Sequence, residues 1–259
     1  MPDTELTPAQ APAPSTVSSE LATEMVKAGI VIGHTKSKTH PRMRPFIAGT
    51  RNEVELLSPE STLESLGEAT AFLKTVAVRN GIVLLVGTGL PARGVVLEFA
   101  NEFKFPYVTT RWLGGTLTNF KVISTRLRQF EELKEKKEKG ELQKYTKREQ
   151  LEFDKDISKM AKSFTGLRRL AKLPDALIVV DVREHLTAVR EARALSIPVV
   201  AIMDTDDDPD LATYPVFASD HAKSSIEWVF GKFRDALREA LAAAVAAARH
   251  LCACTEHHA

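Results

Sequence analysis

A short glycine-containing segment has the residues of a nucleotide-binding loop. The sequence GTGLPA, from Gly87 to Ala92, follows an apolar run and precedes a helical stretch, which fits the dinucleotide pattern G-x-G-x-x-A. In such loops, backbone amides at a helix N-terminus approach a pyrophosphate. The pattern also needs an acidic residue about 20 positions later for the ribose, and Arg111 stands there instead. Because Arg111 could face a 2′-phosphate, an NADP-binding α/β oxidoreductase using this loop is one interpretation, and a tight strand-to-helix turn is the other.

Two further segments carry groups that bind metals. Residues 204–210 (DTDDDPD) hold five carboxylates, but Pro209 and Pro215 stand where a calcium loop needs glycine and glutamate. A C-terminal cluster could supply tetrahedral zinc ligands from Cys252, Cys254, His257 and His258. Its C-x-C spacing is not common in zinc fingers, so we expect a disordered tail that binds no metal. We also find no arrangement typical of nucleophilic catalysis, and therefore predict no metal, no cofactor and no catalytic residue.

The elements that position these groups alternate between strands and helices. Apolar runs at residues 82–86, 176–180 and 199–203 are typical of strands buried on both faces. Shorter strands are expected at residues 54–57 and 107–109. Helices are expected from Ser58, where a hydroxyl cap precedes Pro59 and Glu60, and also over residues 185–195 and from about 220 to 249. The pattern predicts a parallel sheet with helices on both faces.

One segment interrupts this alternation. Between the strands that end near residue 110 and begin near 174, residues 131–156 contain 17 charged side chains, nine acidic and eight basic. Mixed charge at helical spacing supports a solvated helix through pairs four residues apart. We predict two helices forming a hairpin that turns between Gly140 and Thr146.

Positive charge is concentrated locally, although the whole chain carries 35 basic and 34 acidic residues and a net charge of +1. Residues 34–52, 103–130 and 157–174 contain no acid. Unpaired bases in such numbers indicate phosphate binding, and an irregular basic loop suits folded RNA. Arg111 and Trp112 could pair a phosphate contact with base stacking, although Trp112 could equally be a core residue. The predicted RNA-binding residues are His34, Lys36, Lys38, Arg42, Arg44, Arg51, Arg111, Trp112, Lys121, Lys159, Lys162, Arg168 and Arg169.

Five ordered motifs give the chain a resemblance to the bacterial-type small-subunit ribosomal protein two family. They are MVKAGIVIGH at residues 25–34, HPRMRPFI at 40–47, RWLGGTLTNF at 111–120, LPDALIVVD at 173–181 and IPVVAIMDT at 197–205. The resemblance implies a flavodoxin-like sheet with an inserted coiled-coil hairpin, no enzymatic activity, and a structural role in the small ribosomal subunit. It implies small-subunit ribosomal RNA and neighbouring ribosomal proteins as partners, with the mRNA-binding protein one as a candidate.

These observations predict four parts. Residues 1–20 are expected to be a disordered tail, and residues 21–115 with 174–249 an α/β RNA-binding domain. Residues 116–173 form the helical hairpin insertion, and residues 250–259 a Cys/His-containing tail. Two cysteines, no signal-peptide pattern and no apolar run of membrane-spanning length lead us to expect a cytoplasmic protein on the ribosome, with no membrane partner and no small-molecule substrate.

Overall fold

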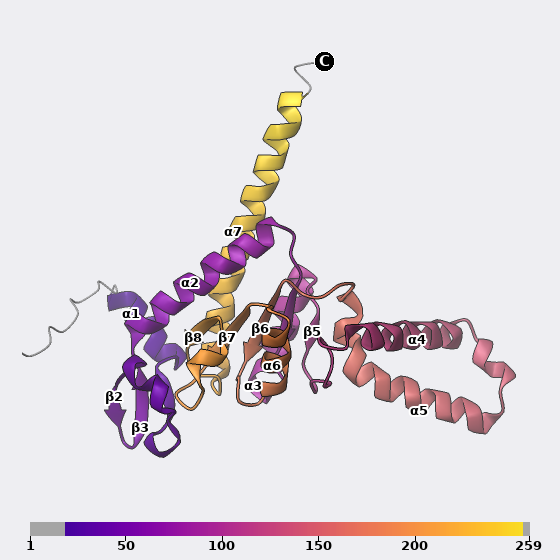
Figure 1. The fold of residues 1–259 in the computed structure, drawn as a ribbon, viewed down its shortest axis with the longest axis horizontal. Helices are drawn as coiled ribbons and strands as arrows, with labels where there is room; N and C mark the ends of the chain where they lie inside the picture. Colours follow the sequence, from indigo (N-terminus) through magenta and orange to yellow (C-terminus); the bar gives the residue numbers. More distant parts are fainter. Residues whose placement is uncertain (1–18, 256–259) are drawn as a thin grey trace, which may run out of the picture.

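A parallel sheet lies at the centre of the molecule (Figure 1). The computed structural model describes residues 19–255. The sheet is formed by β4 (Val83–Val86), β5 (Tyr107–Val108), β6 (Ala176–Val180), β7 (Val199–Met203) and β8 (Tyr214–Phe217). All neighbouring strands are parallel and their order is β5-β4-β6-β7-β8. This corresponds to the flavodoxin-like order 2-1-3-4-5, so the predicted fold class is confirmed.

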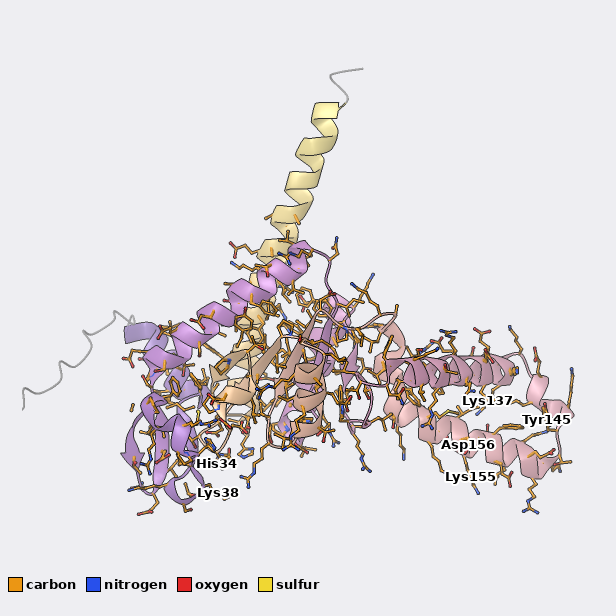
Figure 2. The ribbon with its side chains drawn as sticks, viewed as in Figure 1. His34, Lys38, Lys137, Tyr145, Lys155 and Asp156 are labelled. Atoms are coloured by element: carbon orange, nitrogen blue, oxygen red, sulfur yellow. The ribbon has the colours of Figure 1, made fainter. Side chains whose placement is uncertain are left out.

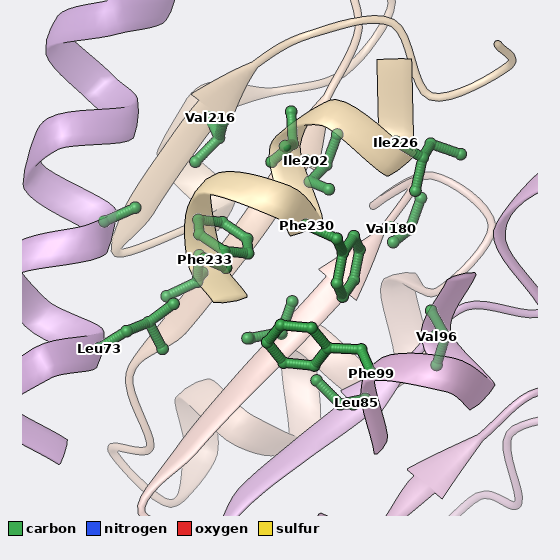
Figure 3. Close-up of a cluster of buried hydrophobic side chains, with 14 of the residues drawn as sticks. Leu73, Leu85, Val96, Phe99, Val180, Ile202, Val216, Ile226, Phe230 and Phe233 are labelled. Carbon is green, nitrogen blue, oxygen red and sulfur yellow. The ribbon is translucent and has the colours of Figure 1, made fainter. Parts of the chain in front are cut away.

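Alternate residues of each strand enter two separate cores. On one face, Leu85, Val180 and Ile202 pack with Phe99, Phe230 and other side chains from the covering helices (Figure 3). Those helices are α1 (Ser19–Ala28), α2 (Pro59–Val78), α3 (Leu90–Phe103) and α7 (Lys223–Thr255). Because side chains alternate across a strand, the intervening residues face the opposite layer.

The opposite face is covered by a short helix and by the base of a helical hairpin. The helix is α6 (Leu186–Ala194), and the hairpin consists of α4 (Phe120–Glu138), η3 (Glu141–Lys144) and α5 (Lys147–Phe164), followed by η4 (Thr165–Arg169). Ile123, Phe130 and Phe164 of the hairpin belong to the same buried cluster as Leu84 and Leu177 of the sheet. The predicted hairpin is therefore present, and its base is part of the core.

The hairpin projects from the body as two helices, with its turn far from the sheet (Figure 1). The turn lies within the predicted span. There, Thr146 caps α5 by accepting a hydrogen bond from the backbone N–H of Glu149, while the Glu149 carboxylate accepts one from the backbone N–H of Thr146. This reciprocal capping box fixes the start of the returning helix.

A second, smaller sheet lies at the other end of the body. It contains β1 (Ile32–Thr35), β2 (Ile47–Arg51) and β3 (Val54–Leu57), all antiparallel. Asn52 and Glu53 join β2 to β3 with φ angles of 51° and 63°, the left-handed values required at both central positions of a tight type I′ turn. The prediction that residues 54–57 belong to the parallel sheet is wrong, because this turn pairs β3 with β2. The 3₁₀ helices η1 (Lys36–Lys38) and η2 (Pro41–Phe46) connect β1 to β2, and η5 (Pro209–Leu211) precedes β8.

The predicted cap of α2 is confirmed, whereas α7 begins later than the predicted position near residue 220. The Ser58 hydroxyl accepts a hydrogen bond from the backbone N–H of Ser61 at 3.4 Å. In α7, the backbone N–H of Ile226 donates to the carbonyl of Ala222, so Asp220 lies before the helix and is buried. The helix also continues to Thr255, past the predicted end at 249.

The predicted N-terminal tail lies mostly outside the described residues, whereas residues 250–255 of the predicted C-terminal tail belong to α7. Residues 1–18 and 256–259 fall outside the described part, so the expected disorder of residues 1–20 stays a prediction. Residues 19 and 20 begin α1. No helix of residues 19–255 combines the length and the apolar character needed to cross a membrane.

Replacing residues 131–156 with a short Gly/Ser bridge should leave a single cooperative unfolding transition. Within this segment only Leu142 is fully buried among the described side chains, so we expect a loss of about 2 kcal/mol. Removing residues 123–164 instead would expose one face of the sheet and should abolish cooperative unfolding. Thermal denaturation followed by circular dichroism measures both; loss of the transition in the first variant would show that the whole hairpin belongs to the core.

Candidate nucleic-acid interface

The glycine-containing loop between β4 and α3 lies at the point where a flavodoxin-like sheet would bind a small molecule. Here the buried side chain of His185 occupies that point. Its Nδ1 lies 2.8 Å from the carbonyl oxygen of Asp181, which can only accept, so Nδ1 carries the proton. Nε2 then accepts from the backbone N–H of Thr88 at 3.2 Å and lies 3.0 Å from the Thr88 hydroxyl. The Thr88 N–H is thus already bonded within the protein, and the loop is a strand-to-helix turn.

The two glycines of this loop differ in the space around them. A Cβ on Gly87 would lie 3.0 Å from Val96 and 3.2 Å from Ala92, whereas a Cβ on Gly89 would meet nothing closer than 3.7 Å. Gly89 also has an ordinary φ of −58°. Gly87 is therefore the glycine that the turn requires.

An acidic cluster forms where three strands of the parallel sheet end. Carboxylate oxygens of Asp181, Asp207 and Asp220 lie within 4.8 Å of one another. Oxygen atoms so arranged can coordinate a divalent cation, and these are the described residues placed to hold one. Of these three residues, the metal-binding segments found in the sequence include only Asp207, because the sequence does not show which strand ends are neighbours.

Burial and repulsion between carboxylates change the titration of two members of this cluster. Burial, together with the neighbouring carboxylates, raises the pKa of Asp207 to about 7 and the pKa of Asp220 to about 9. His34 approaches from β1, with its Nδ1 3.1 Å from Asp204 and 3.5 Å from Asp206. The hydrogen bond to Asp204 outweighs burial and raises the pKa of His34 above its ordinary value.

The first acid-free stretch lies around the small sheet, at the end of the body opposite the hairpin; Figure 2 shows His34 and Lys38 there. Two of its predicted RNA-binding residues have partners brought from distant parts of the chain. His34 faces the acidic loop, and Arg42 lies 3.1 Å from Asp208 and 2.6 Å from Asp210. The other four are exposed and, among the described side chains, no carboxylate lies within 4.0 Å of them. We call these the end cations: Lys36, Lys38, Arg44 and Arg51.

Two of the end cations share a cavity. Lys36 and Arg44 line a polar hollow of about 430 Å³ together with Thr39, Ile47 and the buried carboxylate of Glu55. The Thr39 hydroxyl donates to Glu55, so part of this carboxylate is already used. The cavity therefore presents two cations at one place on the surface.

The second and third acid-free stretches meet at the base of the hairpin. The Thr110 hydroxyl donates to the carbonyl of Lys162 at 2.7 Å. A Cβ on Gly166 would overlap the carbonyl oxygen of Tyr107, so η4 packs directly against β5. Of the predicted RNA-binding residues at this base, four are exposed and have no carboxylate within 4.0 Å among the described side chains. We call these the root cations: Arg111, Lys121, Lys159 and Lys162.

Three other predicted residues at this base make contacts within the protein. Arg168 pairs with Glu131 at 3.2 Å, and Arg169 donates to the carbonyl of Ala100 at 3.0 Å. Trp112 is half-buried and its Nε1–H donates to Glu191 at 3.1 Å. Sequence reasoning missed Glu191 because nothing in the sequence indicates that α6 faces this loop.

Comparisons with known proteins agree with the motifs found in the sequence. A model of the family described as ribosomal protein S2 matches residues 25–240. Small ribosomal subunit protein uS2 of Coprothermobacter proteolyticus is 37% identical over 216 residues, which cover 83% of this chain and 81% of that protein. The uS2 protein of Thermus thermophilus is 38% identical over 217 residues, covering 84% of this chain and 85% of that protein.

In metal-free buffer, the free energy of unfolding should fall as the pH rises from about 4 to about 9. In the unfolded chain Asp207 and Asp220 release their protons near 3.8, whereas in the folded protein they hold them until about pH 7 and 9. Each proton that only the folded protein retains lowers the free energy of unfolding by about 1.4 kcal/mol per pH unit, between the pKa of the group in the unfolded chain and its pKa in the folded protein. Urea denaturation at several pH values measures this.

Asp220→Asn removes one titrating group and should flatten the decline between pH 7 and 9. Glu68→Gln, an exposed carboxylate on α2, is the control and should leave the decline unchanged. A decline of the same steepness in both variants would mean that Asp220 does not hold its proton in the folded protein.

Proposed function

The chain belongs to the ribosomal protein S2 family, and we propose that the end cations and the root cations hold it on ribosomal RNA. It is a structural constituent of the small ribosomal subunit that binds ribosomal RNA and supports translation. The supporting observation is the distribution of charge. A chain with a net charge of +1 exposes two groups of unpaired cations, one around the small sheet and one at the hairpin base. Phosphates attract such cations irrespective of base sequence.

The remaining predicted RNA-binding residues contribute less to the affinity for RNA in this proposal. Arg42, Arg168 and Arg169 are exposed, but each would exchange an intramolecular contact for a phosphate. Because that exchange offsets part of the gain, their contribution to affinity is less than that of an unpaired cation. His34 and Trp112 act by fixing the loops that carry the exposed cations.

Neighbouring proteins of the subunit are proposed as further partners. An apolar hollow of about 550 Å³ lies between α1 and the small sheet, where Val26 and Ile32 are 61% and 52% exposed. Exposed apolar surface of this kind marks protein–protein contacts. We propose that a neighbouring subunit protein covers it, with the mRNA-binding protein one as a candidate, and that the chain resides on cytoplasmic ribosomes.

We propose no enzymatic activity for the chain. The loop that suggested an NADP-binding oxidoreductase has its Thr88 amide bonded to His185, and the family is one of structural proteins. The Arg93 Nε–H also donates to the Thr88 carbonyl at 2.7 Å, which closes the turn further. Neither observation favours a cofactor at this point.

The variant Lys36→Ala/Arg44→Ala/Arg51→Ala should weaken binding to small subunits depleted of this protein. Each phosphate contact releases counterions, so the slope of log affinity against log salt should flatten by two to three units, about one per contact. Filter binding across a range of monovalent salt measures the slope. This set omits Arg42, because Asp208 and Asp210 already neutralise it.

The matched control removes three lysines that are paired inside the hairpin. Lys134, Lys137 and Lys139 lie 3.7, 2.8 and 3.4 Å from Glu138, Asp154 and Glu135. Their triple replacement by alanine removes the same total charge, yet the slope should hardly change. Equal flattening in both triple variants would contradict the proposal, because binding would then respond to total charge alone.

A further inference from the structure

A single buried carboxylate on α6 organises the loop that leads into the hairpin. Glu191 is 8% exposed and accepts hydrogen bonds through both of its oxygens. Oε1 accepts from Trp112 Nε1–H at 3.1 Å and from the backbone N–H of Gly115 at 2.8 Å. Oε2 accepts from the backbone N–H of Leu117 at 2.9 Å, and from the N–H and hydroxyl of Thr118 at 3.3 and 3.4 Å.

These donors keep the carboxylate ionised without any basic partner. Burial alone would raise the pKa of Glu191, but the hydrogen bonds from Leu117, Trp112, Gly115 and Thr118 together hold it below its ordinary value. Among the described side chains, no lysine, arginine or histidine lies within 4.0 Å of it. The loop is therefore folded around an internal anion, much as other loops fold around a bound phosphate. Removing the charge would leave several N–H groups without an acceptor, which is costly in a buried site.

The consequence for the interface lies in what flanks this loop. Arg111, a root cation, stands between two anchored residues. Thr110 is held by its hydrogen bond to the carbonyl of Lys162, and Trp112 is held by Glu191. At its other end the loop enters α4, whose first turn carries Lys121. The carboxylate thus fixes the backbone on which two root cations stand.

We propose that Glu191 is a positioning residue of the RNA interface: it does not contact RNA, but it holds Arg111 and Lys121 in the arrangement that binds phosphate. This inference rests on the proposed function of the root cations. It assigns a role in RNA binding to a side chain that has no exposed charge of its own. The effect works through orientation, since a flexible arginine loses more conformational freedom on binding than one already held in place.

The test compares Glu191→Gln with Val189→Ala in the full-length protein. Glutamine has the same shape but directs an amide donor at the N–H groups of the loop. Val189 lies on the same helix and is fully buried, and its apolar side chain cannot accept hydrogen bonds from the loop amides, so its truncation lowers stability by another route. Glu191→Asp keeps the charge on a shorter side chain and should show an intermediate effect, which provides a second measurement if the glutamine variant folds poorly.

Five measurements test the predicted effect. In Glu191→Gln, amide exchange at Gly115, Leu117 and Thr118 should accelerate at least about tenfold, and the emission of Trp112, read in a Trp228→Phe background, should change. Affinity for small subunits depleted of this protein should fall by about tenfold, and the salt slope should flatten by about one unit as the Arg111 contact is lost.

Arg111→Ala should then reduce the affinity much less in the Glu191→Gln background than in the native protein, because both changes remove the same contact. Val189→Ala should lower the melting temperature but leave loop exchange, affinity and slope unchanged.

Two results would overturn the inference. One is an unchanged rate of amide exchange in the loop, which would mean that Glu191 does not hold it. The other is a loosened loop with native affinity and full additivity with Arg111→Ala, which would mean that loop position does not matter for binding. Failure of the native protein to bind depleted subunits would instead contradict the proposed function, so the two failures are distinguishable.

Discussion

The burial of both faces of the parallel sheet is the constraint on which the rest of the structure depends. Strands β4, β6 and β7 are buried along their whole length, so each face needs a covering layer. One layer consists of α1, α2, α3 and α7, and the other is completed only by the base of the hairpin. The hairpin is thus held to the body by the same apolar contacts that stabilise the sheet. The backbone that carries the cations at its base is therefore held in place. Binding of a rigid RNA surface by these cations would then cost little conformational freedom.

The same constraint explains where polar groups are found. A sheet with two apolar faces leaves only its edges and connecting loops for charged residues. At the carboxyl edge this gathers Asp181, Asp207 and Asp220 closely enough to raise the pKa values of Asp207 and Asp220. At the hairpin base it turns Glu191 inward, where backbone donors replace a basic partner. The end cations and the root cations lie at the periphery of the body, around the small sheet and at the base of the hairpin.

The parts of the structure that depend on local signals could be predicted from the sequence. Apolar runs indicated β4, β6 and β7, the hydroxyl of Ser58 indicated the start of α2, and mixed charge indicated the hairpin. Edge strand β8 escaped prediction because Pro215 lies within it, and proline is tolerated in a sheet mainly at edges. The partners of Arg42 and the donors to Glu191 lie more than 70 residues away along the chain, so no local pattern reveals them. Absence of acids from a stretch of sequence did not guarantee unpaired cations in the fold.

Tethered hydroxyl-radical probing of assembled small subunits tests the central claim most directly. Iron chelates would be attached at Ser37→Cys beside the end cations, at Ser158→Cys beside Lys159, and at Glu64→Cys among the exposed acids of α2, with Cys252 and Cys254 replaced by serine. We predict strong cleavage of ribosomal RNA at two separate segments from positions 37 and 158, and weak cleavage from position 64, because acids repel phosphate. Cleavage of equal strength from position 64, or none from either cation group, would contradict the account.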